Sequence, residues 1–454
     1  MFGKVQNIHF VGIGGIGMSG IAEVLVNIGF SVSGSDIKGS ATTERLSSLG
    51  VSINIGHEAK AIEGAQVLVV SSAVKPNNPE VEAAYATKIP VIPRGEMLAE
   101  LMRMKQGIAV AGSHGKTTTT SMIAHILSKG GLDPTIVVGG RLGILGSNAK
   151  LGKGPTLVAE ADESDGSFLM LSPTWAIITN IDREHLDYYK DLDEIKSSFV
   201  DFANKVPFYG CALVCMDCAN VASIRPQLRR QVRTYGTTPQ TDIRALNIRQ
   251  EGFSTYFEVN AFGQSMGNFM LCVPGRHMAL NALAAIGMAL EMGVEVDVIR
   301  TALGEFTGAD RRFTIKGERD DILVVDDYGH HPTEIAATLS GARSGFACRR
   351  IVAAFQPHRY SRTEVLLNEF ARSFFEADVV VICDIYAASE APIAGLTGQT
   401  LVDALRATGQ KEVYYVPDIK DMSATLHEIT RPNDLLITFG AGSITQVGPA
   451  FLQI

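Results

Sequence analysis

Residues 107–129 predict a short apolar strand, a glycine loop and a helix, and this order restricts the fold more than any other segment. The strand is the run Gly107–Ala111 and the helical pattern continues over Thr119–Lys129. The loop between them consists of Gly112, Ser113, His114, Gly115, Lys116, Thr117 and Thr118. Glycines let backbone N–H groups converge on an anion, a lysine reaches β- and γ-phosphates, and a hydroxyl group binds Mg²⁺. The segment therefore predicts a P-loop and a nucleoside triphosphate ligand.

The spacing of this loop is tighter than the usual G-x-x-x-x-G-K-[ST] pattern. A bare Gly-Lys-Thr after an apolar run can also belong to an ordinary strand–loop–helix. The run of threonines from Thr117 to Thr120 argues against that alternative, because β-branched residues are poor helix formers.

An acidic segment supplies the carboxylate that a P-loop requires. The apolar run Pro155–Glu160 predicts a strand that ends in a carboxylate, and residues 161–165 add further acidic side chains. Mg²⁺ takes oxygen ligands, commonly one or two carboxylates beside phosphate oxygens, so Glu160 is the predicted metal ligand. A solvated acidic loop is the alternative interpretation.

A second nucleotide-type signal lies near the N-terminus. The predicted strand Val5–Val11 leads into Gly12–Gly17, a full G-x-G-x-x-G, and a helix follows to Asn27. A second strand, Phe30–Ser33, ends near Asp36, where a dinucleotide fold places its ribose-binding carboxylate. Alone, the motif indicates NAD, and it equally indicates another pyrophosphate on a helix N-terminus.

Composition excludes several classes of protein. The chain has 454 residues, of which 46% are hydrophobic and 19% charged, enough for two to four domains with buried cores. A formal net charge of −8 argues against a nucleic-acid platform. The sequence does not approach about 18 continuous apolar residues, so we expect no membrane span and a cytoplasmic protein.

Six cysteines in this length do not form a disulfide scaffold. Cys215 and Cys218 form a CxxC pair, which permits a redox or zinc interpretation. A second CxxC or a histidine pair is absent nearby in sequence, so we expect thiols packed against strands.

The order of elements predicts an α/β fold of three domains, with limits at 1–105, 106–308 and 309–454. Alternating strands and helices predict parallel sheets with right-handed crossovers. We expect a Rossmann-like N-terminal domain, a central P-loop ATPase-type parallel-sheet domain and a C-terminal Rossmann-like domain. The expected strands include Ile8–Gly12, Val32–Gly34, Val67–Ser71, Val91–Ile92, Leu157–Glu160, Ala176–Thr179, Ala212–Cys215, Ile322–Asp326, Ile351–Phe355, Val379–Cys383, Val413–Val416 and Leu435–Thr438, with helices over Glu96–Arg103 and Ala279–Met292.

The third domain carries a polar constellation of its own. Polar residues follow two predicted strands, in segments 326–332 and 355–362, and strand C-termini are where α/β sheets bind ligands. Arg359 and Arg362 suit a carboxylate or phosphate, and their spacing predicts that both lie on one side of a helical turn. The adjacent His330 and His331 point in different directions, which favours hydrogen bonding at a domain interface over metal binding.

Six segments together resemble the Mur ligase family of peptidoglycan synthesis. They are Gly112–Thr119, Glu160–Asp165, Thr179–Tyr189, Gly275–His277, Asp326–Pro332 and Gln356–Arg362. The resemblance covers all three domains and nearly the whole length. It is closest to the members that join L-alanine to UDP-N-acetylmuramate.

The resemblance implies a role for each set of residues. The UDP part would be bound by Gly14, Gly15, Ile16, Gly17, Asp36, Ser71 and Arg94. ATP would be bound by residues 112–118, by His277 and Asn281 at the adenine, and by Arg311, Arg312 and Asp327 from the third domain. Met278 stands where the family usually has Asn. L-Alanine would be held by Tyr328, His358, Arg359 and Arg362.

Catalysis is assigned by the same resemblance to Lys116, Glu160 and His185. Mg²⁺ would be bound by Thr117 and Glu160, with a second ion at His185; a hydrogen-bonding histidine is the alternative there. The implied substrates are UDP-N-acetylmuramate, ATP and L-alanine, in a monomer or homodimer. Phosphorylation of the lactyl carboxylate would give an acyl phosphate that the amine of L-alanine attacks, releasing ADP and phosphate. Three substrates on three domains imply closure.

Two other classes remain as alternatives. An NAD-dependent oxidoreductase would explain residues 12–36 but not the P-loop. A nucleotide-dependent binding or regulatory protein would explain the P-loop but not Arg359 and Arg362. Phosphate release that needs both L-alanine and the UDP-sugar would distinguish the three classes.

Overall fold

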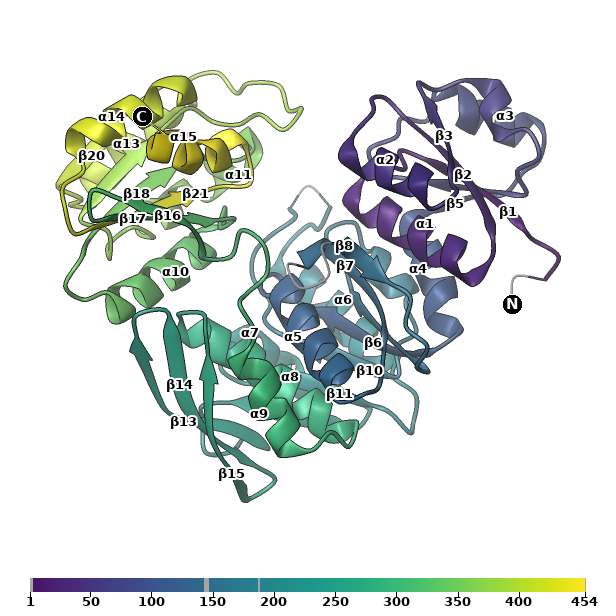
Figure 1. Cartoon of the computed structure of the whole chain (residues 1–454), viewed down its shortest axis with the longest axis horizontal. Helices are drawn as coiled ribbons and strands as arrows, with labels where there is room; N and C mark the ends of the chain where they lie inside the picture. The colour runs from purple at the N-terminus through teal and green to yellow at the C-terminus, as the bar shows by residue number, and fades with distance from the viewer. Residues whose placement is uncertain (1–2, 143–146, 187, 454) are drawn as a thin grey trace. The chain divides into compact units, whose positions relative to one another are not determined.

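The computed structural model describes residues 3–142, 147–186 and 188–453. The chain packs as two compact units. The first unit holds residues 1–246, 259–267 and 280–303, and the second holds 247–258, 268–279 and 304–454. Three sheets organise the described residues, each with its own helices (Figure 1). The fold is therefore the three-domain α/β architecture that the sequence predicts.

The first sheet has five parallel strands in the order β3-β2-β1-β4-β5. The order reverses beside β1, because β2 lies on one side of it and β4 on the other. Ligands bind beyond the carboxyl ends of strands at such a switch point. The strands are β1 (Asn7–Val11), β2 (Ser31–Asp36), β3 (Ser52–Ile55), β4 (Val67–Val70) and β5 (Val91–Pro93), and the helices are α1 (Ile16–Ile28), α2 (Ala41–Ser48), η1 (Ala59–Ile62), α3 (Pro79–Ala86) and α4 (Arg94–Arg103).

The second sheet has ten strands in the order β15-β14-β13-β12-β11-β10-β6-β9-β7-β8. Strand β6 lies between β10 and β9 and pairs in parallel with both, so the carboxyl ends of these three strands share one edge. The strands are β6 (Gln106–Ala111), β7 (Thr135–Leu142), β8 (Ser147–Lys150), β9 (Thr156–Glu160), β10 (Trp175–Ile178), β11 (Cys211–Cys215), β12 (Val232–Gly236), β13 (Ile243–Glu251), β14 (Ser254–Ala261) and β15 (Gln264–Leu271). The helices are α5 (Lys116–Lys129), η2 (Ser167–Met170), α6 (Leu192–Asn204), α7 (Ala219–Ile224), η3 (Arg225–Gln227), α8 (Arg276–Glu291) and α9 (Val296–Gly304).

The third sheet has six strands in the order β16-β17-β21-β18-β19-β20. Successive residues of β18 belong to different clusters: Ile351, Ala353 and Phe355 to one, Val352 and Ala354 to the other. Both faces of the sheet are thus covered, which explains its continuous apolar strands. The strands are β16 (Thr314–Arg319), β17 (Ile322–Asp327), β18 (Arg350–Phe355), β19 (Val379–Ile382), β20 (Glu412–Tyr415) and β21 (Asp434–Phe439), and the helices are α10 (Pro332–Gly345), α11 (Tyr360–Val365), α12 (Leu367–Phe370), α13 (Gly398–Ala407), α14 (Ile419–Ile429), η4 (Ser443–Gln446) and α15 (Val447–Gln453).

Edge strands depart from the purely parallel pairing predicted for the sheets. Strand β8 pairs antiparallel with β7, and β16 pairs antiparallel with β17. The residues of β16 are half-buried or exposed, and the short edge strand β3 is mostly exposed. Such strands carry little of the apolar pattern by which the buried strands are recognised.

The CxxC pair is placed by the packing of β11. Cys215 is the last, buried residue of that strand, and Cys218 is the N-cap residue of α7. Both cysteines are free thiols, and burial raises the pKa of Cys215 to about 12. A thiol that resists ionisation in this way packs as a small apolar group, as predicted.

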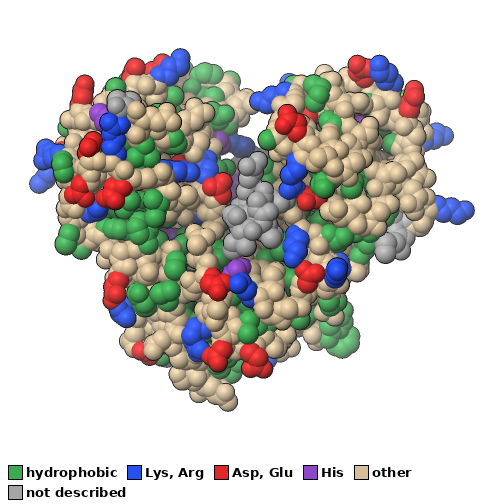
Figure 2. Space-filling view, viewed as in Figure 1, with side chains coloured by type: hydrophobic (Ala, Val, Ile, Leu, Met, Phe, Trp, Pro, Cys, Tyr) green, Lys and Arg blue, Asp and Glu red, His purple; other side chains and the backbone are tan. Residues whose placement is uncertain are grey.

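No helix among residues 3–142, 147–186 and 188–453 combines the length and apolar character needed to cross a membrane. On the face drawn in Figure 2, basic and acidic side chains are interspersed.

Gly287 in α8 allows close packing of that helix on β11 and β13. A Cβ atom at this position would overlap Ile243 Cδ1 and lie 2.9 Å from Leu213 Cδ2. Helix propensity favours alanine by about 0.5–1 kcal/mol, whereas overpacking costs about 1–3 kcal/mol. We expect Gly287→Ala to lower the free energy of unfolding by about 1 kcal/mol, measured by urea denaturation.

Gly304→Ala is the control, because Gly304 is also a helical glycine, the last residue of α9, but a Cβ there would meet only Met270 Cε, at 3.8 Å, among the described residues. A free energy of unfolding for Gly287→Ala that equals or exceeds that of the wild type would contradict the packing argument.

Candidate active site

The phosphate loop joins β6 to α5 through two glycines in the left-handed region. Gly112 has a φ of 137° and Gly115, the N-cap residue of α5, has a φ of 81°. A Cβ at Gly112 would overlap Thr179 Oγ1, and a Cβ at Gly115 would lie 2.7 Å from Asn281 Oδ1. Only glycine meets both the conformational and the steric requirement at these positions.

The segment after β10 holds the loop in place. The N–H of His114 donates to Asn180 Oδ1 at 2.8 Å, and the Thr179 hydroxyl donates to the carbonyl of His114 at 2.6 Å. The N–H of Asp182 donates to Ser113 Oγ at 2.8 Å. Thr179, Asn180 and Asp182 were missed as site residues by the sequence argument, although they lie in the quoted segment 179–189. Thr118 is buried in the first turn of α5.

Lys116 meets an acidic residue that the sequence argument did not select. Its Nζ donates to Gly112 O at 2.7 Å and to Glu163 Oε1 at 2.7 Å. Burial favours the neutral amine, but the charges of Glu163, Asp162 and Glu184 outweigh it and raise the pKa of Lys116. The ammonium group therefore stays charged inside the protein.

Glu160 and Thr117, the two predicted metal ligands of the loop, lie together. The Thr117 side chain and the N–H of Gly139 are hydrogen-bonded to Glu160, but burial dominates and raises the pKa of this carboxyl group. Its Oε1 is buried and has no hydrogen-bond partner among the described residues. A buried carboxylate oxygen without a donor suits a cation.

His185 belongs to a second acidic group. Its Nε2 lies 3.6 Å from Glu163 Oε1 and 3.8 Å from Glu184 Oε2, and the ligand atoms of the three residues all lie within 4.8 Å of one another. Burial lowers the pKa of His185, yet the hydrogen bond to Glu163 and the charge of Glu184 raise it overall. His185 has a φ of 56°, an uncommon conformation that often marks a functional position.

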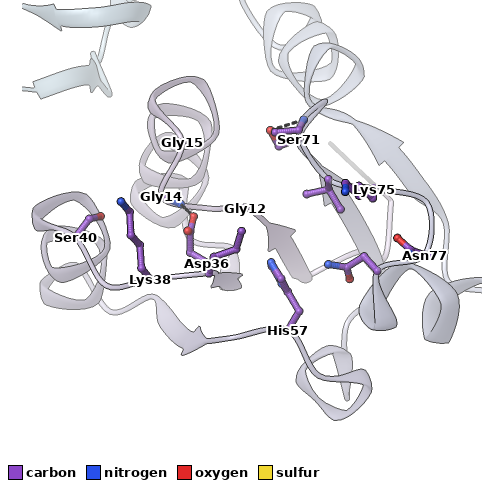
Figure 3. A pocket seen from close by; sticks show the side chains of 14 residues that line it. Gly12, Gly14, Gly15, Asp36, Lys38, Ser40, His57, Ser71, Lys75 and Asn77 are labelled. Atoms are coloured by element: carbon purple, nitrogen blue, oxygen red, sulfur yellow. Dashed lines mark hydrogen bonds between the residues drawn. The ribbon is translucent and has the colours of Figure 1, made fainter. Parts of the chain in front are cut away.

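A cavity of about 510 Å³ opens at the switch point of the first sheet (Figure 3). Gly14, Gly15, Asp36 and Ser71, four of the residues that the sequence analysis assigns to UDP, line it. The N–H of Gly14 donates to Asp36 Oδ2 at 2.8 Å, and Gly15 is the N-cap residue of α1. Gly12, the first glycine of the predicted motif, also lines the cavity; lining residues that the sequence argument missed are Ile37, Lys38, Ser40, His57, Ala73, Val74, Lys75, Asn77 and Asn78.

Ile16, Gly17 and Arg94 do not line this cavity. Arg94 lies against Gly17, where a Cβ would be 2.9 Å from its Nη1, and Arg94 Nη2 pairs with Asp162 Oδ2 at 3.0 Å. The arginine thus contacts the acidic segment that follows β9.

In the second unit, Tyr328 connects the predicted nucleotide and alanine residues. The guanidinium groups of Arg311 and Arg312 lie 5.0 and 5.4 Å from the centre of its ring. His330 lies between Tyr328 and His358, with ring-centre distances of 5.2 and 5.8 Å. Tyr328 and His330 follow β17, and His358 follows β18. The two arginines precede β16, which pairs antiparallel with β17, so the structure gathers all five residues at one edge of the third sheet.

Asp327 lies beneath this cluster and is only 2% exposed. Its two carboxylate oxygens accept from the N–H groups of Phe313 and Gly329, at 2.9 and 2.7 Å. Burial nevertheless raises the pKa of Asp327 to about 6. The carboxylate positions the loops that carry Arg312 and Tyr328.

Glu334, which the sequence argument missed, binds Arg312 Nη1 at 3.0 Å and accepts from the N–H of His330 at 3.1 Å. His331 caps α10, with its Nδ1 accepting from the N–H of Thr333. Burial and the charge of Arg312 lower the pKa of His277 to about 4, which leaves this histidine neutral. His277 belongs to the second unit, whereas Asn281 lies in the first, against the phosphate loop; Met278 is buried.

The helical reason given for Arg359 and Arg362 is wrong. Arg359 is the N-cap residue of α11 with a φ of 71°, and only Arg362 lies on the helix. The N–H of Arg359 donates to Tyr386 O at 2.9 Å, while Arg362 Nη1 lies 3.4 Å from His358 Nδ1. The two guanidinium groups therefore start from different backbone conformations.

Family comparisons match all three parts of the chain. Residues 7–106 match the Mur ligase family, catalytic domain; residues 110–289 match the Mur ligase middle domain; and residues 311–442 match the Mur ligase, glutamate ligase domain. The chain belongs to the Mur ligase family.

Relatives with the same overall length are named for one reaction. A protein of Geobacter sp. (strain M21) called UDP-N-acetylmuramate--L-alanine ligase is 56% identical over 452 residues, covering 100% of this chain and 98% of the relative. One of Solibacter usitatus (strain Ellin6076) with the same name is 56% identical over 455 residues, covering 100% and 96%. The solved UDP-N-acetylmuramate-alanine ligase of Thermotoga maritima aligns with a TM-score of 0.82 at 31% identity, covering 98% of each chain.

His358 generates a pH prediction for stability. Burial lowers its pKa to about 4, helped by the neighbouring His330 and Arg362. An unfolded histidine has a pKa of about 6.5, so between these values the unfolded state binds a proton that the folded state rejects. The stabilising contribution of neutral His358 is therefore present above about pH 6.5 and is lost as the pH falls towards 4. We expect the melting temperature of His358→Gln to fall less steeply over this range than that of the wild type.

His427→Gln is the control, because His427 stacks on Phe451 elsewhere in the second unit. That variant is expected to keep the slope of the wild type even if its melting temperature is lower throughout. A His358→Gln profile parallel to the wild type would contradict the assignment.

Proposed function

We propose that this chain is an ATP-dependent ligase that joins L-alanine to the lactyl carboxylate of UDP-N-acetylmuramate in peptidoglycan synthesis, acting in the cytoplasm. The observation that carries the proposal is a P-loop lysine beside the Glu163–Glu184–His185 group, in a chain 56% identical to ligases of that name. We take the domain limits as 1–105 for the UDP-sugar, 106–308 for ATP and 309–454 for the amino acid.

Mg²⁺ is the metal that the donor set suits best. Thr117 and Glu160 offer a hydroxyl group and a buried carboxylate oxygen without a partner, and Glu163 Oε2 is likewise buried without one among the described residues. We propose Thr117 and Glu160 for one ion, and Glu163, Glu184 and His185 for a second. A bound Mg²⁺ supplies positive charge that stabilises the phosphate oxygens during transfer.

The reaction proceeds by two displacements. A lactyl carboxylate oxygen attacks the γ-phosphorus of ATP, and the bond between that phosphorus and the oxygen bridging to the β-phosphate breaks. ADP departs, and the lactyl carboxylate has become an acyl phosphate. The neutral amine of L-alanine then attacks the carbonyl carbon of the acyl phosphate, the nitrogen loses a proton to solvent, and the bond between that carbon and the phosphate oxygen breaks, giving the amide and phosphate. Lys116 and the N–H groups of the glycine loop stabilise charge on the γ-phosphoryl group, so positioning and electrostatics supply most of the catalysis.

The residues of the second unit have the chemistry that the other two ligands require. We propose that Arg311 and Arg312 contact the nucleotide and that Asp327 holds their segment in place from the interior. Arg359 and Arg362 are proposed to bind the carboxylate of L-alanine. Neutral His358 accepts from Arg362 Nη1 at its Nδ1 and therefore carries its proton on Nε2, which can donate to the carboxylate of L-alanine, and Tyr328 completes the site.

The test of function is phosphate release by the purified chain with Mg²⁺-ATP. We expect release only when UDP-N-acetylmuramate and L-alanine are both present, and mass spectrometry should detect UDP-N-acetylmuramoyl-L-alanine. Release without the amino acid, or tight binding of NADH to the N-terminal cavity, would overturn the proposal in favour of a regulatory nucleotidase or an oxidoreductase.

Lys116→Ala should reduce the ligation rate on the order of 10²–10³-fold, because one electrostatic group at the transferring phosphate is removed. UDP-N-acetylmuramate binding, measured by calorimetry, should persist because the cavity of the first sheet does not include this residue. Lys129→Ala, an exposed change at the end of the same helix, is the matched control. Near-normal turnover in Lys116→Ala would rule out the assignment of residues 112–118.

Arg359→Lys should raise KM for L-alanine severalfold or more and change KM for ATP and UDP-N-acetylmuramate little. A methyl-sized group contributes only about 0.8 kcal/mol, so recognition of alanine must rest on its carboxylate, which lysine cannot grip in two places. Steady-state kinetics with each substrate varied in turn measures the effect, with the exposed Arg372→Lys as control. A change confined to ATP would move this arginine to the nucleotide site.

A further inference from the structure

A buried histidine–glutamate–histidine cluster stands behind the cavity of the first sheet. Glu80, fully buried, accepts from Ser35 Oγ at 2.6 Å and lies 3.1 Å from Nε2 of the equally buried His9. Its other oxygen lies 3.2 Å from His57 Nδ1 and accepts from the N–H of Glu58 at 3.2 Å. His57 is the member of the cluster that lines the cavity.

The hydrogen bonds around His57 determine its tautomer. Burial raises the pKa of Glu80, but hydrogen bonds from His9, Ser35 and His57 prevail and lower it, so the carboxylate is ionised and only accepts. The Ser35 hydroxyl gives its hydrogen to Glu80, so Ser35 Oγ, 3.0 Å from His57 Nδ1, also acts as an acceptor there. Two acceptors face Nδ1, which must therefore carry the proton. In the neutral ring, Nε2 is then a hydrogen-bond acceptor.

The place of His57 in the cavity indicates which part of a ligand it faces. Gly14 and Gly15 lie at the N-terminus of α1, where backbone N–H groups attract a diphosphate. Figure 3 shows His57 on the other side of Asp36 from Gly15, with its ring pointing into the cavity. A nucleoside diphosphate with its phosphates at Gly14 and Gly15 thus extends its nucleoside towards His57.

We propose that His57 Nε2 accepts a hydrogen bond from the imide N–H of a uracil base, and that Glu80 is a positioning residue that fixes this acceptor. The inference rests on the proposed function, which puts a UDP-sugar in this cavity. Cytosine has an unprotonated ring nitrogen where uracil has the imide N–H, so with cytosine two acceptors would oppose each other. The cavity therefore selects uracil over cytosine.

Calorimetry on the full wild-type chain tests the selection with four probes: UDP, CDP, N3-methyl-UDP and 2′-deoxy-UDP. We expect UDP and 2′-deoxy-UDP to bind at least about tenfold tighter than CDP and N3-methyl-UDP, a difference of about 1.4 kcal/mol. Equal affinities for UDP and N3-methyl-UDP would overturn the inference. A loss confined to 2′-deoxy-UDP would place the discrimination at the ribose rather than at the base and would likewise overturn the inference. Failure of every probe to bind would overturn the proposed function of the cavity as well.

Variants separate the acceptor from its support. His57→Phe keeps a planar ring without a nitrogen, so the UDP-to-CDP ratio should fall close to one. Glu80→Gln should lower that ratio severalfold and raise KM for UDP-N-acetylmuramate with little change in kcat. Lys75→Gln, on the cavity wall, should weaken UDP and CDP by the same factor and leave their ratio unchanged.

The tautomer of His57 can be measured directly. It would not change in a Glu80 variant if Glu80 had only a structural role. Nitrogen-15 spectra of the His57 ring should show a proton on Nδ1 in the wild type and a mixture of tautomers in Glu80→Gln. A wild-type ring protonated on Nε2, alone or on both nitrogens, would overturn the inference. Because these spectra and the probe affinities are measured on the unaltered chain, the test stands even where a variant fails to fold.

Discussion

The ion pair between Lys116 and Glu163 is the interaction on which the central site depends. At 2.7 Å it joins the loop after β6 to the segment after β9, and Glu163 also lies beside His185, which follows β10. These three strands are neighbours in the sheet, so their carboxyl ends deliver the three segments to one place. Removing either partner of a buried pair leaves an uncompensated charge that costs about 3–5 kcal/mol. The other oxygen of the same carboxylate, Glu163 Oε2, is buried without a hydrogen-bond partner among the described residues and is thus available to a cation.

Three residues of the polar site segments adopt an uncommon backbone conformation. His185, Arg311 and Arg359 all have φ values between 56° and 71°, in a region that residues with a side chain seldom adopt. Such conformations cost of order 1–3 kcal/mol each and persist only where the surroundings enforce them. Arg311 is held in this way by its hydrogen bonds to Asp326 and to the carbonyl of Gly440, at 3.0 and 2.6 Å. Rigid placement of a charged group is what positioning catalysis requires.

The sequence predicted the buried strands and the phosphate loop because their signals are local. The same local signal selects Glu160, at the end of β9, as a metal ligand. It does not reveal that Lys116 pairs with Glu163, because the chain turns at Asp162, whose carboxylate accepts from the N–H of Ser164 at 3.1 Å. Such a turn is decided by one side chain and leaves no periodic pattern. His57 and Glu80 were missed for a related reason: their contact links segments 23 residues apart, which neither a motif nor a spacing records.

Arg94 shows how the first cavity and the phosphate loop are connected within the first unit. It begins α4, lies against Gly17 of α1 and pairs with Asp162, the residue before Glu163. Burial raises the pKa of Asp162, but Lys116, the Ser164 hydrogen bond and Arg94 outweigh it and hold that pKa below its usual value. Two cations, one from each sheet, therefore act on a single carboxylate. Because the charge of Asp162 also raises the pKa of Lys116, a shift of Arg94 changes the electrostatic environment of the phosphate loop without touching it.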